Sequence, residues 1–247
     1  MQVLVQSKVA VQPRTSAVVR LVDEYFYMFM SVFIAGIVTY GFSRTVDHNL
    51  IHSAVRKPAM LWVHGIVFSG WLVFFMVQSL LVRVRKVRLH RTLGWLGAAW
   101  GAAVIFVGVT TTFIMARFHV YQLHATDMSF LLVPLWDISC FAVCFGLAIH
   151  WRKRPEFHRR LLLIATCAIA AAGIGRFPEW IVPPGAFYVG VDLLILFGVA
   201  RDLIVDRRIH AVYRAVLPVL VVGQALVLFV IITKPALWMS ISSALSR

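Results

Sequence analysis

The sequence predicts an all-α, polytopic membrane protein with seven transmembrane helices. Of its 247 residues, 61% are hydrophobic and only 14% are charged. Apolar stretches recur along the chain, each close to the roughly 20 residues that a helix needs to cross a bilayer. The net charge of +14 is confined to short segments between these stretches, as is typical of membrane topology and of contact with anionic lipid. We therefore expect the lipid bilayer, and no nucleic acid, as the partner of the basic side chains.

The apolar runs divide the chain into an N-terminal arm and one transmembrane domain. We expect residues 1–22 to form a cytosolic arm and residues 23–247 to form the domain. The seven predicted spans are Tyr25–Phe42, Ala59–Val82, Thr92–Ala116, Asp127–Ile149, Arg159–Ile174, Gly185–Val205 and Tyr213–Thr233. Spans two to five, within about residues 59–176, should pack as a four-helix core. The short apolar tail after Pro235 is expected to lie in the membrane interface.

The distribution of lysine and arginine predicts the orientation of the domain. If the N-terminus is cytosolic, 17 of the 24 Lys and Arg residues fall on the cytosolic side and 7 on the other. The positive-inside rule then favours a cytosolic N-terminus and an external C-terminus. This bias suits a bacterial inner membrane, so we expect a multi-pass protein of that membrane.

Two segments of the sequence share one pattern. Val82–Leu96 (VRVRKVRLHRTLGWL) and Ile149–Leu163 (IHWRKRPEFHRRLLL) each turn the chain from one apolar run into the next. Each places a histidine, followed at once by arginine, at the start of a new span. These histidines are His90 and His158. Their matched positions on the cytosolic side indicate a shared role.

Four histidines can be paired across the predicted core. His64 lies near the outer end of span two, and His124 at the outer end of span four. The 26 residues from His64 to His90 cover nearly a full bilayer thickness, so these two must lie near opposite membrane faces, and His124 and His158 repeat that relation. In a four-helix bundle His64 can then face His124, and His90 can face His158. Such imidazole pairs suit six-coordinate haem iron, which predicts one or two haem b groups and electron transfer.

Basic side chains next to the cytosolic pair could neutralise the anionic propionates of a haem. Arg91 follows His90 directly, and Arg159 and Arg160 follow His158. Charge-assisted hydrogen bonds from guanidinium groups to carboxylates are the strong type of hydrogen bond in proteins. We therefore include these arginines in the predicted cofactor site.

The motifs Leu89-His90-Arg91-x-Leu93-Gly94 and Trp62-x-His64-Gly65 resemble the cytochrome b-561 family and related bacterial haem-binding membrane proteins. The resemblance covers roughly residues 59–176. It implies a helical bundle with two b-type haems, one near each membrane face, whose ligand pairs come from alternate helices. It also implies His64 with His124 and His90 with His158 as ligands, and an oxidoreductase role that could be linked to a quinol.

Two acidic residues inside predicted spans suggest a different class of function. Asp137 lies in span four, three residues after Pro134, and Asp192 lies in span six. Carboxylates within a membrane usually face a bundle interior, pair with a partner or carry protons. A transporter that uses these two acids is therefore an alternative to the cytochrome. A non-catalytic subunit or assembly partner of a larger respiratory or photosynthetic complex is another.

Other polar groups allow simpler interpretations. A histidine among arginines at the start of a helix is often only solvated at the interface, which applies to His90 and His158. The outer group of His119, His124 and Asp127 could hold a metal ion, although the two histidines do not have the i, i+4 spacing of one helix face.

The turn after span five, RFPEWIVPPG, is rich in aromatic residues and proline. Its charges, Arg176 and Glu179, could pair with each other. Such a composition is typical of an anchor at the membrane interface. It could equally form the edge of a pocket for a quinone or a lipid.

Overall fold

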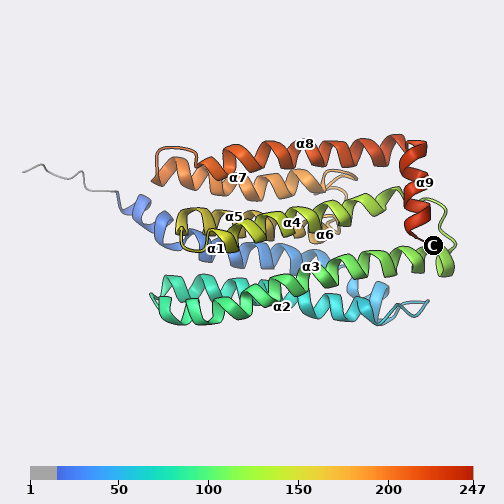
Figure 1. Cartoon of the computed structure of the whole chain (residues 1–247), viewed down its shortest axis with the longest axis horizontal. Helices are drawn as coiled ribbons and strands as arrows, with labels where there is room; N and C mark the ends of the chain where they lie inside the picture. Colours follow the sequence, from blue (N-terminus) through green and yellow to red (C-terminus); the bar gives the residue numbers. More distant parts are fainter. Residues whose placement is uncertain (1–15, 247) are drawn as a thin grey trace, which may run out of the picture.

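The computed structural model describes residues 16–246, and 81% of these residues are helical. No strand occurs in this described range. Figure 1 shows the long helices lying side by side along one axis, with one short helix across an end of the bundle. The all-α class and the polytopic membrane character predicted from the sequence agree with this architecture.

The helices follow the apolar runs in chain order. They are α1 (Ala17–Ser43), α2 (Met60–Arg83), α3 (Val87–Leu123), α4 (Leu132–His150), α5 (Pro155–Ile169), α6 (Ala171–Ile174), α7 (Phe187–Val205), α8 (Ala211–Thr233) and α9 (Ala236–Leu245), with a π-helical turn η1 (Asp47–Ile51) and a 3-10 turn η2 (Ser129–Leu131). Six segments are long and apolar enough to span a membrane: α1, α2, α3, η2 with α4, α5 with α6, and α8.

The predicted count of seven spans is thus not confirmed. The segment expected as span six forms α7, which lies beside α8 in the bundle (Figure 1). It carries three charged residues, Asp192, Arg201 and Asp202, within its 19 residues. The six apolar segments each contain a long stretch with fewer charges.

Two boundaries differ from the sequence prediction in ways that affect function. Helix α1 begins at Ala17, so residues 17–22 of the predicted arm belong to the first helix, and residues 1–15 lie outside the described range. Helix α3 continues through most of the predicted loop 117–126 and ends only at Leu123. Its C-cap, His124, has the left-handed φ of 51° that closes the helix.

The bundle contains two antiparallel hairpins, and α5 in the second hairpin is its central helix. Helix α2 packs along α3, and α4 packs along α5. Helix α5 with α6 is the most deeply buried of the apolar segments, and its Leu163 and Ile164 meet Phe141 of α4 and Ile195 of α7 in the main core. Because α5 packs against α1, α4 and α7, its polar side chains can reach all three helices.

The two ends of the bundle differ in chemistry. The start of α1 and the α2–α3, α4–α5 and α7–α8 turns lie at one end, which we call the basic end (Figure 1). The α1–α2, α3–α4 and α6–α7 connections and helix α9 lie at the other, which we call the α9 end. There Trp238 of α9 donates a hydrogen bond to the Ser129 carbonyl at 3.2 Å, which fixes the apolar tail across the bundle.

Candidate functional site

The structure brings His90 and His158 together at the basic end. His90 lies in the first turn of α3 and His158 in the first turn of α5. Both side chains are half-buried. Their ring centroids are 6.5 Å apart, with the ring planes at 78° to each other. The two repeated segments of the sequence therefore meet in space through their histidines.

The two imidazoles have different surroundings. His158 Nδ1 lies 2.8 Å from the carbonyl oxygen of Ala148 in the last turn of α4. Donation from Nδ1 to a carbonyl fixes the tautomer and leaves Nε2 free as an acceptor or ligand. In contrast, His90 Nδ1 is buried without a hydrogen-bond partner, and so are both amide atoms of Gln78 on α2. The pair thus combines an imidazole oriented by Ala148 with one that contacts the Gln78 backbone, next to unsatisfied polar atoms.

The three arginines predicted to serve a haem have different positions. Arg91 is exposed at the surface of α3. Arg159 lies over the ring of Tyr27 of α1, with 5.2 Å from Cζ to the ring centroid, and its Nε is buried without a partner. Arg160 points away into a network of ion pairs, so its guanidinium is already used.

That network is the most extensive set of buried charges in the described residues. Arg160 Nε and Nη2 donate to the two carboxylate oxygens of Asp202 at 2.8 and 2.5 Å, and Nη2 also reaches Asp206 at 2.8 Å. Arg201 Nη1 donates to Asp202 at 3.0 Å and to Asp206 at 2.6 Å, and its Nη2 pairs with Asp23 of α1. Since Arg160, Arg201 and Asp202 are almost fully buried, the network ties α1, α5 and α7 together.

Sequence reasoning missed this network, although one signal was present. The prediction treated Arg160 and Arg201 as topology or cofactor charges, and Asp202 was not considered. An adjacent Arg201-Asp202 pair within an otherwise apolar stretch is costly in a membrane unless both charges find partners. Arg160 lies 42 positions before Asp202, and Asp23 lies 178 positions before Arg201, so a local pattern does not reveal these two partners.

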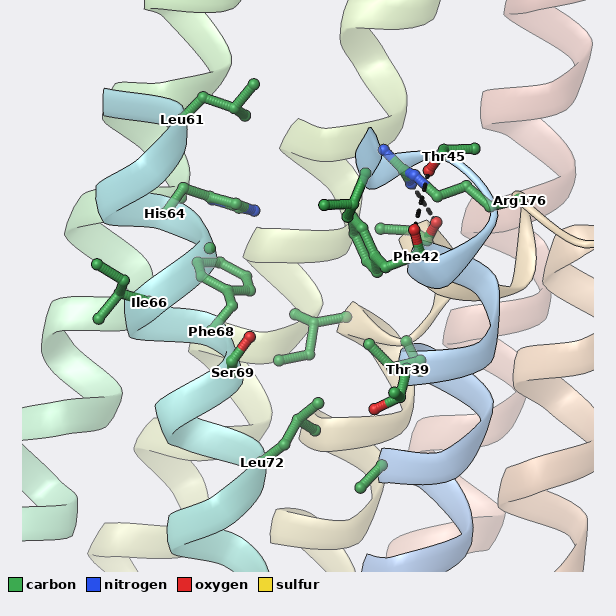
Figure 2. Close-up of a pocket in the computed structure, with 18 of the residues that line it drawn as sticks. Thr39, Phe42, Thr45, Leu61, His64, Ile66, Phe68, Ser69, Leu72 and Arg176 are labelled. Carbon is green, nitrogen blue, oxygen red and sulfur yellow. Dashed lines mark hydrogen bonds between the residues drawn. The ribbon is translucent and has the colours of Figure 1, made fainter. Parts of the chain in front are cut away.

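A second candidate region is a cavity of about 750 Å³ between α1 and α2, toward the α9 end. His64, Asp137 and Arg176 are the ionisable side chains among its lining residues. The imidazole of His64 points into this space and stacks on Phe68 at 4.0 Å between centroids (Figure 2). Its Nδ1 is buried without a partner.

The structure does not bring His64 and His124 together, which corrects the predicted outer pair. Helices α2 and α3 form a hairpin that turns near Arg85. His64 lies 21 residues before that turn and His124 lies 39 after it, so the difference corresponds to about 27 Å along the bundle axis. His124 is also exposed. The prediction failed because it ended the third span too early.

The two acidic residues singled out in the sequence have separate environments. Asp137 lines the cavity, and its Oδ1 accepts a hydrogen bond from the Tyr188 hydroxyl of α7 at 3.1 Å. Asp192 on α7 interacts with Gln224 of α8, while its Oδ1 is buried without a partner. They lie on different helices and do not share a site.

The outer residues expected as an alternative metal site do not form one. Within residues 16–246 no group of three or more His, Cys, Asp or Glu side chains could hold a metal ion. Asp127 instead pairs with Lys234 at 2.5 Å. The hydrogen bond from Lys234 is the main cause that lowers the pKa of Asp127 to about 2.

The turn after α6 also differs from the prediction. Arg176 makes no ion pair with Glu179, which is exposed. Its Nη1 instead donates to the carbonyl of Ala172, and its guanidinium lies over the Phe42 ring at 4.2 Å from Cζ to the ring centroid. Arg176 thereby enters the wall of the cavity.

Comparisons with known proteins leave the chain without a relative to argue from. No family model, curated protein or solved structure matches it. The functional argument therefore rests on the geometry of the described residues.

Proposed function

We propose that the protein is an integral membrane b-type cytochrome that holds one haem between His90 and His158 and transfers electrons in the bilayer. The observation that supports this most strongly is the 6.5 Å separation of the two ring centroids. Two metal–imidazole bonds of about 2 Å, with roughly 1 Å from each nitrogen to its ring centre, would need about 6 Å between two rings that hold one metal ion. The observed separation fits that requirement.

The residues around the pair also fit a haem. Ligating histidines usually donate their second ring nitrogen to a carbonyl or carboxylate, as His158 does to Ala148. The unsatisfied Nδ1 of His90 and Nε of Arg159 are polar groups for which a bound group can supply partners. In this proposal His90 and His158 would hold the haem iron, and Arg159 would hydrogen-bond a propionate.

A haem with two histidine ligands supplies one-electron transfer and has no open position for oxygen. The protein residues supply the rest. The bond to Ala148 holds the His158 ring in one orientation, the network around Arg160 fixes the start of α5, and the packing of α4 against α5 limits water at the pair. Because His64 and His124 lie apart, the proposal includes one haem rather than two.

The orientation and location are part of the same proposal. The basic end carries the α2–α3 and α4–α5 turns with their arginines, so the positive-inside rule puts this end in the cytosol. The haem would then lie near the cytosolic face of a bacterial inner membrane. Helix α9 would lie along the external surface.

The test is the visible spectrum of detergent-purified protein expressed with ample haem, before and after reduction with dithionite. We expect a bound b-type haem in the wild type, and its loss or a change to a high-spin spectrum in His90→Ala and in His158→Ala. His150→Ala is the matched control, because His150 lies exposed at the end of α4. His64→Ala and His124→Ala should keep the full haem content.

Two results would refute the proposal. One is wild-type protein that folds but binds no haem. The other is full haem content in both His90→Ala and His158→Ala, which would show that other residues bind the iron. Loss of haem in His64→Ala with retention in His90→Ala would favour the cavity between α1 and α2 as the cofactor site.

A further inference from the structure

Arg176 is a cation in the wall of a mostly apolar cavity without a carboxylate partner. Among the described residues it forms no ion pair, and its contacts are the Ala172 carbonyl and the Phe42 ring. A guanidinium carries five N–H donors, and one of them is used by the Ala172 carbonyl. Figure 2 shows its nitrogens directed toward the space between α1 and α2, across from His64. Arg176 is therefore available to bind an anion there.

The cavity has a polar end and an apolar end. Arg176, His64 and Thr45 lie toward the α9 end, whereas Leu72 lines the part that reaches toward the middle of the bundle (Figure 2). Met76, one turn further along α2, also lines the cavity. From His64 to Met76 helix α2 advances 12 residues, which is about 18 Å. This order, from membrane surface to membrane centre, matches the head and the chain of a lipid-like molecule.

The mouth of the cavity lies on the apolar side of the bundle. Among the lining residues on α2, Trp62, Ile66 and Val73 expose 48, 70 and 55% of their surface. These side chains belong to a helix apolar enough to span the membrane, so their exposed surface faces hydrocarbon. An occupant would enter sideways from the bilayer.

We propose that this cavity binds an anionic amphiphile, with its carboxylate or phosphate head on Arg176 and its acyl chain along α2 toward Met76. His64 donates a hydrogen bond to the head. Asp137 also lines the cavity, but it is an acid whose Oδ1 already accepts the Tyr188 hydrogen bond, so it offers no cation to an anionic head and leaves Arg176 as the place for the head. Neutral lipids lack the charge that Arg176 requires.

This site is separate from the proposed haem. His64 lies 14 residues before Gln78, the α2 residue whose backbone lies next to His90, so about 21 Å separates the two levels along the bundle. Binding of the amphiphile can therefore be measured whether or not a haem is present.

The experiment is native mass spectrometry of the delipidated full-length protein in detergent. The probes are a long-chain fatty acid, its methyl ester, phosphatidylglycerol and phosphatidylcholine. We expect one acidic amphiphile to bind in preference to its uncharged or zwitterionic counterpart. Arg176→Gln should weaken that binding at least about tenfold, because it removes a charge-assisted hydrogen bond in an apolar site. Arg44→Gln is the matched control, since Arg44 is exposed at the end of α1.

A second pair of variants tests the space rather than the charge. Gly65 lines the cavity, and a Cβ at this position meets no atom within 4 Å. Gly65→Leu should place a side chain in the cavity and abolish binding. Gly36→Leu is the control, because Gly36 on α1 has equally open surroundings but does not line the cavity.

The outcomes separate the sources of the ligand. Binding of the fatty acid alone identifies a free carboxylate, and binding of phosphatidylglycerol alone identifies a membrane phospholipid. Equal binding of the methyl ester and the acid, unchanged affinity in Arg176→Gln, or no binding of any probe would overturn the proposal.

Discussion

The charge network and the histidine pair lie at the same end of the bundle, yet their buried polar atoms are satisfied to different degrees. In the network, Arg160 donates to Asp202, to Asp206 and to the Glu156 carbonyl. Near the histidine pair, in contrast, both amide atoms of Gln78 and the Nδ1 of His90 have no partner. The network pairs its charges within the protein and leaves only the Nε of Arg201 buried without a partner, whereas the pair is open.

This difference helps to distinguish buried polar groups that stabilise the fold from those that could bind a ligand. A buried polar group without a partner costs roughly 1–3 kcal/mol, so a folded protein keeps few of them unless they serve another purpose. The network explains how charged side chains survive in an apolar bundle. The open groups at the histidine pair, and at His64 in the cavity, indicate where ligands can bind.

Adjacent arginines on α5 give the strongest test of this comparison. Arg160→Met should destabilise the protein by about 3 kcal/mol, because it leaves Asp202 and Asp206 with one cation in a buried site. Arg159→Met should cost less than about 1 kcal/mol, since its guanidinium has no carboxylate partner and mainly covers Tyr27. The measurement is the unfolding of each haem-free variant in detergent micelles, followed by circular dichroism. Equal losses in the two variants would contradict the distinction between closed and open groups.

Sequence reasoning succeeded where the physics is local. Apolar runs predicted the all-helical membrane architecture, although only six of the seven expected spans are long and apolar enough to cross a bilayer. The repeated His-Arg pattern put His90 and His158 at matched positions at the starts of α3 and α5, and the two rings lie close together. Both inferences depend on the lengths of the helices and on the turns that join them.

It failed where one boundary or one distant partner decided the result. The pairing of His64 with His124 depended on where α3 ends, and α3 runs seven residues beyond the predicted Ala116. The network depended on partners from α1, α5 and α7. The cavity depended on two features of packing. Helices α1 and α6 lie so close that a Cβ at Gly41 would overlap the Gly173 backbone. Residues of α2 and Arg176 then line the same space. A local sequence pattern predicts none of these contacts.

Two buried glutamines provide a test of intermediate size. Gln78→Leu should raise the stability of the haem-free protein by about 1 kcal/mol, because it removes an amide that has no hydrogen bond and keeps a side chain of similar volume. Gln224→Leu should lower stability by about 1–2 kcal/mol, because it takes from Asp192 the side chain with which it interacts. The same unfolding assay compares them. A loss of stability in Gln78→Leu would mean that this amide is satisfied and that the open region is smaller than described.

The smallest expected effect concerns pH at the edge of the network. His210 in the α7–α8 turn caps α8, because its Nδ1 accepts a hydrogen bond from the Val212 amide at 3.2 Å. Burial lowers the pKa of His210 below its ordinary value, and the positive charges of Arg160 and Arg208 add to the lowering, against Asp202 and Glu156. Only the neutral ring can accept the bond from Val212.

A lowered pKa in the folded state means that the unfolded chain binds the proton more readily. The stabilisation by His210 should therefore be complete above the unfolded pKa of about 6.5 and be lost as the pH falls through the lower folded value. His210→Asn keeps a capping oxygen that does not titrate. The two proteins should be about equally stable at neutral to mildly alkaline pH, and the wild type should fall behind by up to about 1 kcal/mol in mild acid. Because every other titrating group is shared, a difference that stays constant with pH would show that His210 does not cap α8 as a neutral acceptor.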